Sequence, residues 1–128
     1  MLRLEARASL YPTEDEEKVR QALLNLFPGG TVDLEGDGLV LRSEEIDQFK
    51  HTIRSLRILD ATRNALRKGI SGNFTSFSLN KQAACAGKVS QAEGAPPLGN
   101  INVRIEAEDI EKEIDSIAPQ TVNGEEMR

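Results

Sequence analysis

The stretch INVRIEAEDIEKEIDSIAP, residues 101–119, decides the fold class because it holds two different amphipathic patterns in succession. Apolar and polar residues alternate over residues 100–107, which is the period of a strand with one buried face. Asp109 is then well placed to cap a helix over 109–117, whose isoleucines recur every three or four residues on one side. A one-sided strand followed by a one-sided helix predicts a sheet that is covered by helices on a single face.

The rest of the chain repeats these two patterns. Further strands are predicted near residues 2–9, 31–35, 38–42, 73–79 and 86–90. Further helices are predicted near residues 14–26, 44–50, 53–68 and 80–85. The expected fold is α+β, with a mostly antiparallel sheet and all helices packed on one face, because the alternating strands leave their other face polar.

The composition predicts one domain in a reducing compartment. A chain of 128 residues is long enough for a single core, expected over residues 1–118, while residues 119–128 have little to bury and are expected to fray. One cysteine fits the cytoplasm, and no apolar run approaches the ~20 residues of a membrane span. The net charge of -5 argues against generic nucleic-acid binding, whose affinity comes largely from neutralised phosphates.

Two apolar stripes in the helical region 44–68 point in nearly opposite directions. The first stripe is made of Ile46, Phe49, Ile53 and Leu56, and the second of Ile58, Thr62, Ala65 and Leu66. This pattern predicts either a break near residues 50–53 or one helix held between its own core and a partner chain. Because Ile53 and Leu56 lie among basic residues, we predict that they contribute to a two-fold interface.

The segment SFSLNKQAACAGKVS, residues 76–90, admits two interpretations. In the first, Asn80 caps a short helix whose small residues let it approach the sheet closely. Cys85 is then expected to be buried and slow to react. In the second, the helix N-terminus binds an anion with help from Lys81 and Lys88.

No catalytic, cofactor-binding or metal-ligating residue is predicted. The single histidine, His51, has no second histidine or cysteine cluster with which to form a zinc site. Gly87-Lys88 does not complete a phosphate loop, since Gln82 and Val89 stand where glycine and a hydroxyl residue are required. We therefore expect that the protein is not an enzyme and uses no cofactor.

Three segments together resemble a known family. They are RILDATRNALRKG at 57–69, LNKQAACAGKV at 79–89 and LGNINVRIEAEDIEKEIDSIAP at 98–119. They are similar to the archaeal uncharacterised protein family 0201. The resemblance implies a fold similar to the large-subunit ribosomal protein that binds five-S RNA, together with a two-fold homodimer. The family is filed as predicted RNA-binding and exosome-associated, and it has no catalytic residue to carry over.

Two functional hypotheses follow. The first is a non-catalytic homodimer that acts through protein contacts, for example as a partner in an RNA-processing assembly, with little or no RNA binding. The alternative is a binder of structured RNA or ribonucleoprotein, with weak and salt-sensitive affinity. Its contacts would come from Arg54, Arg57, Lys68, Lys81 and Lys88. A contiguous positive patch would favour RNA, and a mosaic of both charges would favour protein contacts.

Overall fold

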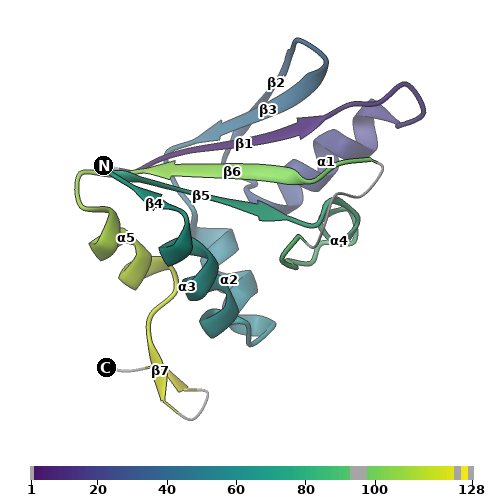
Figure 1. The fold of residues 1–128 in the computed structure, drawn as a ribbon. Coiled ribbons are helices and arrows are strands. Elements are labelled where there is room, and N and C mark those ends of the chain that lie inside the picture. The colour runs from purple at the N-terminus through teal and green to yellow at the C-terminus, as the bar shows by residue number, and fades with distance from the viewer. Residues whose placement is uncertain (1, 93–97, 123–124, 127–128) are drawn as a thin grey trace.

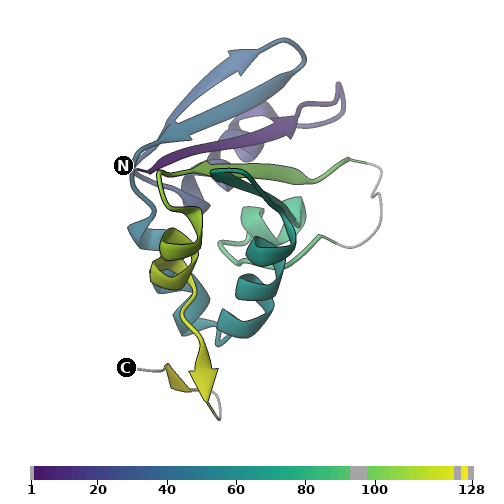
Figure 2. The ribbon, with the colours of Figure 1, turned by 60° about the vertical axis from the view of Figure 1, so that its left-hand side comes forward.

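Six strands form one antiparallel sheet, and five helices lie on a single side of it (Figures 1 and 2). The structure is a computed structural model that describes residues 2–92, 98–122 and 125–126. The strands are β1 Arg3–Ser9, β2 Thr31–Glu35, β3 Gly38–Ser43, β4 Ile70–Ser71, β5 Phe74–Leu79 and β6 Ile101–Glu106. The helices are α1 Glu16–Leu26, α2 Asp47–Ser55, α3 Leu59–Lys68, α4 Lys81–Cys85 and α5 Ile110–Ile117. The predicted α+β class, with helices on one face, is confirmed.

The strand order β2-β3-β1-β6-β5-β4 places β1 and β6 at the centre of the sheet. Ala6 of β1 lies opposite Leu41 of β3 on one side and Val103 of β6 on the other, and all three are buried. Because side chains alternate along a strand, this register puts every second residue of these strands under the helices. No helix of the described residues covers the opposite side of the sheet (Figures 1 and 2).

Three aromatic rings join the helical layer to the sheet. Phe27, at the end of α1, stacks on Phe49 of α2 with ring centroids 5.4 Å apart. Phe49 in turn lies 6.1 Å from Phe77 of β5. Such ring pairs contribute about 0.5–1.5 kcal/mol each beyond the area that they bury. The aromatic residues therefore serve the core, apart from Tyr11, which is exposed, and Phe74.

The break between the two apolar stripes lies later than predicted. Helix α2 continues to Ser55, and the chain turns at Arg57, whose φ of 57° lies in the left-handed region. The turn gives α3 a new direction, so that the second stripe also faces the core and Leu66 is fully buried. The prediction that Ile53 contributes to an interface is wrong, because its side chain is 0% exposed within one chain. Leu56, at the turn, is 39% exposed.

The predicted strand at 86–90 does not form. Helix α4 ends at Cys85, two residues before Gly87, whose φ of 75° suits glycine, and Lys88 N donates to Ala83 O at 2.9 Å. The chain then returns along β5, where Asn80 N donates to Ser90 O and Ala92 N donates to Ser78 O. Near the C-terminus, where fraying was expected, β7 Thr121–Val122 and β8 Glu125–Glu126 pair antiparallel.

The corrected position of Ile53 changes the mutational expectation for this region. Replacing Ile53 with Asp places a charge in a closed core without a partner, and we expect it to lower the free energy of unfolding by more than about 3 kcal/mol. Leu56→Asp, at the exposed turn, should cost less than about 1 kcal/mol. Urea unfolding of both variants measures the difference. If Leu56→Asp also dissociated an oligomer in sedimentation velocity, the α2–α3 turn would be an interface after all.

Candidate functional site on the outer sheet face

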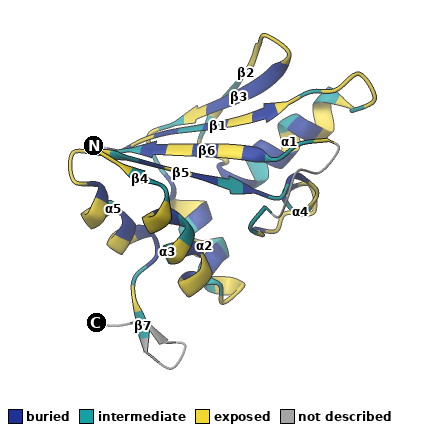
Figure 3. Cartoon of the chain, in the orientation of Figure 1, coloured by how far each residue is buried: buried dark blue, intermediate teal, exposed yellow. Residues whose placement is uncertain are grey.

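The side of the sheet that faces away from the helices is open to solvent, and we call it the outer sheet face. Figure 3 shows exposed residues interleaved with buried ones along β1 and β6. Four arginines and four carboxylates lie on this face, and the register settles their positions. They are Arg3, Arg7, Arg42 and Arg104 together with Glu5, Asp33, Glu35 and Glu106.

Glu5 occupies the centre of this face, with an arginine on each of its four sides. Arg42 of β3 and Arg104 of β6 are its directly opposed neighbours across the strands. Arg3 and Arg7 precede and follow it by two residues on β1, and so they share its face. The four arginines come from three strands, and the pairing of β1 with both neighbours brings them together.

Two of the four arginines are already neutralised within the chain. Arg7 Nε donates to Glu5 Oε1 at 2.5 Å, and Arg42 lies 3.5 Å from the other Glu5 oxygen. Arg42 also makes a close ion pair with Glu35. The hydrogen bond from Arg42 lowers the pKa of Glu35, and the same bond raises the pKa of Arg42.

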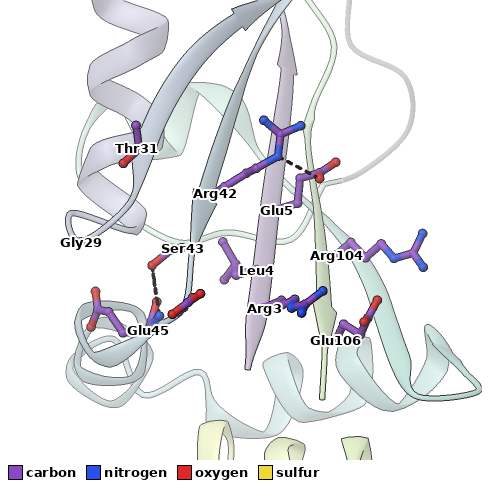
Figure 4. Close-up of a pocket in the computed structure, with 11 residues that line it drawn as sticks. Arg3, Leu4, Glu5, Gly29, Thr31, Arg42, Ser43, Glu45, Arg104 and Glu106 are labelled. Atoms are coloured by element: carbon purple, nitrogen blue, oxygen red, sulfur yellow. Dashed lines mark hydrogen bonds and ion pairs between the residues drawn. The ribbon is translucent and has the colours of Figure 1, made fainter. Parts of the chain in front are cut away.

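The other two arginines, Arg3 and Arg104, make no ion pair with any carboxylate in the described ranges of the chain. The Arg104 guanidinium lies over the ring of Phe74, 3.8 Å from its centroid. In Figure 4, Arg104 points away from Glu5, and Arg3 lies beside Glu106. Both guanidiniums are therefore presented to solvent with donors to spare.

Two shallow hollows lie side by side on the outer sheet face. The larger, of about 830 Å³, runs from Gly29 and Thr31 past Arg42 to Arg3 and Arg104, and its rim carries Glu44, Glu45 and Glu106 (Figure 4). The smaller, of about 460 Å³, is lined by polar groups that include Arg7, Ser76, Ser78 and Asn102. Glu5 and Arg104 belong to both hollows.

Among the residues that the structure describes, no group of three or more His, Cys, Asp or Glu side chains is arranged to hold a metal ion. None of the helices is long and apolar enough to cross a bilayer within that part of the chain. Cys85 is exposed on α4, which corrects the prediction of a buried thiol. The small side chain of α4 that is fully buried is Ala84, whose exposure is 0%.

A family model described as RNA binding matches residues 3–107, from the first arginine of the outer sheet face to just beyond the last. A UPF0201 protein of Sulfurisphaera tokodaii is 40% identical over 133 residues, covering 97% of this chain and 92% of the relative. The chain belongs to the UPF0201 family. A second member, from Methanocaldococcus jannaschii, is 40% identical over 126 residues, covering 92% of this chain and 73% of the relative.

Solved UPF0201 structures have the same fold. A crystal structure of the family member from Methanococcus jannaschii aligns with a TM-score of 0.92 and 38% identity, over 98% of this chain and 99% of that one. A second UPF0201 crystal structure aligns with a TM-score of 0.85 and 31% identity, over 93% of this chain and 94% of that one. The predicted family resemblance is confirmed.

The basic residues predicted to contact nucleic acid do not form one patch in this UPF0201 chain. Arg54 donates to Lys50 O at 3.0 Å and to Ile117 O at 3.3 Å, holding the end of α5. Arg57, Lys68 and Lys88 are exposed. However, Arg57 precedes α3 and Lys68 ends it, about 15 Å apart along a helix of ten residues. Lys88 lies beyond α4 on another part of the surface.

The prediction for Lys81 is corrected, because this side chain is only 5% exposed. Its ammonium donates to Ser9 O and Leu98 O at 2.7 Å each and to Glu14 Oε1 at 2.9 Å. These three acceptors match the three protons of the ammonium. Lys81 therefore joins the end of β1, the approach to α1 and the segment that leads into β6, and it has no proton left for a ligand.

The arginines of the outer sheet face were not identified as contact residues from the sequence. The available signal was that each sits at a polar position of a predicted strand. That signal is common to any solvated strand, and only the register of β1 with β3 and β6 shows that four such positions meet.

Replacing Lys81 with Met tests its structural role. The change leaves Glu14, whose side chain is 9% exposed, without its counter-ion, and we expect a loss of about 3–5 kcal/mol in the free energy of unfolding. Lys88→Met, an exposed change of the same chemistry, should stay within about 0.5 kcal/mol. Equal stability of the two variants in urea unfolding would show that the buried ion pair is not needed.

The ion pair between Arg42 and Glu35 predicts a pH effect. Because the pKa of Glu35 is lowered in the folded chain, the stability from this pair is present above the unfolded pKa and is lost as pH falls through the folded pKa. Arg42→Gln should return the pKa of Glu35 to its ordinary range, as measured by NMR titration of the carboxyl carbon. The difference in stability between wild type and variant should shrink below about pH 4. An unchanged Glu35 titration would contradict the assigned cause.

Proposed function

We propose that the protein is a non-catalytic homodimer that acts through protein contacts, and that the outer sheet face is a surface for such contacts. The observation that supports this most directly is the balance of charge on that face. Its four arginines are matched by four carboxylates, and Arg7 and Arg42 are already paired. A surface with both signs at short intervals suits a protein partner, whose side chains also carry both signs.

The same balance weakens an electrostatic case for RNA. Affinity for a polyanion comes mainly from arginines and lysines that neutralise phosphates, and carboxylates beside them oppose that gain. Glu5 stands among the four arginines, and Glu44, Glu45 and Glu106 lie along the larger hollow. The net charge of -5 acts in the same direction over longer distances.

RNA binding remains the second candidate because the matching family model carries that description over residues 3–107. Four arginines around one position are also the densest basic cluster on this side of the sheet in the described residues. If RNA is bound here, few phosphate contacts are available, so the affinity should be weak and should fall steeply with salt.

Two measurements on the purified protein separate these candidates. Sedimentation velocity is expected to show a dimer, and a fluorescent RNA hairpin is expected to stay unbound at about 200 mM salt. Salt-sensitive RNA binding that is lost in Arg3→Gln/Arg104→Gln would favour the second candidate. Loss in Arg57→Gln/Lys68→Gln instead would place the RNA on the helical side.

A photo-crosslinking residue tests the surface itself in cells. Placed at Ser76, on the outer sheet face, it is expected to capture protein in adducts that resist ribonuclease. Placed at Gln21, on the exposed side of α1, it serves as the matched control. Adducts from Ser76 that contain only RNA would reject protein contact as the function of this face.

A further inference from the structure

We infer that the outer sheet face receives an acidic side chain of a partner polypeptide between Arg3 and Arg104, with neutral or basic side chains on either side of it. This inference rests on the proposed function and names the chemistry of the partner. It assigns a role to the two arginines that have no ion pair among the described residues.

Arg3 and Arg104 are diagonal neighbours on adjacent strands. Arg3 lies opposite Glu106, and Arg104 lies opposite Glu5. Both arginines are therefore on the outer sheet face, and their positions are offset by two residues along the strands. Diagonal neighbours in an antiparallel pair lie about 7–8 Å apart, a separation that two long guanidinium side chains span easily. One carboxylate between them could accept hydrogen bonds from both.

Arg104 is pre-organised for this role. Its guanidinium carbon lies over the ring of Phe74, 3.8 Å from the ring centroid, and this cation–π contact limits the motion of the side chain. A planar fork that is already oriented loses less freedom when it binds a carboxylate in a bidentate manner. Arg3 lines the larger hollow beside it, so the two guanidiniums border one concave surface of about 830 Å³.

The surrounding carboxylates select an isolated negative charge. Glu5 and Glu106 are the directly opposed neighbours of the two arginines, and Glu44 and Glu45 lie along the same hollow. A nucleic acid carries a phosphate at every nucleotide. If one phosphate lay between the two arginines, the neighbouring phosphates would be repelled by these carboxylates. A polypeptide can follow one acidic residue with lysine or arginine, which the same carboxylates would attract.

The test uses the intact protein and three probes of defined chemistry. They are a short peptide that repeats Lys-Thr-Glu-Thr, an all-acidic peptide that repeats Glu-Thr, and an oligouridine of the same length. NMR follows the side-chain Nε–Hε signals of Arg3 and Arg104 during each titration. We expect the alternating peptide to shift both signals in a saturable way and to bind more tightly than either other probe.

Arg3→Gln/Arg104→Gln should weaken the alternating peptide by about tenfold or more, as expected for the loss of charge-assisted hydrogen bonds. Arg57→Gln/Lys68→Gln removes the same charge away from this face and should leave the affinity unchanged. Equal weakening by both pairs, or tighter binding of the all-acidic peptide or the oligouridine, overturns the inference.

The inference and the proposed function can fail separately. If the alternating peptide does not bind and Arg3→Gln/Arg104→Gln converts a dimer to a monomer in sedimentation velocity, a second copy occupies the face. The inference is then wrong while protein contact stands. Ribonuclease-sensitive adducts alone from Ser76 would reject protein contact itself.

Discussion

The pairing of β1 with a strand on each side is the constraint on which the rest of the structure depends. Ala6 and Ala8 of β1 are buried under the helices, where their small side chains allow close approach. The residues that alternate with them along β1, Glu5 and Arg7, are forced onto the opposite face. A slip of one residue would exchange these two sets, burying charge and exposing the core. The same hydrogen bonds therefore fix both the hydrophobic core and the charge pattern of the outer sheet face.

In the described part of the chain, side chains and a neighbouring segment protect the sheet edges at β2 and β5 from pairing with another strand. The outer sheet face is therefore the more accessible surface of the sheet. At the β2 edge, Arg20 of α1 donates to Val32 O at 3.1 Å, and Asp33 and Glu35 add like charges that oppose pairing with another β2. At the β5 edge, the segment that follows α4 makes two backbone hydrogen bonds. Ser90 O accepts from Asn80 N, and Ala92 N donates to Ser78 O. Exposed Leu34, at 58%, is the largest apolar feature left on the β2 side.

Basic residues in this protein serve several different purposes, and their roles follow from their surroundings. Lys81 donates to three acceptors within the chain, and Arg54 donates to the carbonyl oxygen of Ile117 at the end of α5. Arg63 likewise donates to Asp115 at 2.7 Å and to Ala118 O at 3.1 Å. Counting lysines and arginines along a helix overestimates a binding surface, since several of them cap helices or satisfy buried groups. Of the arginines on the strands, Arg3 and Arg104 make no ion pair within the described residues.

The sequence by itself determined the α+β class, the family and the approximate positions of five of the six strands expected, because alternation and helical periodicity are local properties. It did not determine where the 44–68 region turns, since a left-handed residue at Arg57 leaves no periodic signal. Nor did it show that 86–90 follows the sheet edge without forming a strand. The burial of Lys81 and Ile53, and the meeting of four arginines around Glu5, required the tertiary structure. Each depends on which distant segments become neighbours, and strand register sets that relation through hydrogen bonds between segments up to about a hundred residues apart.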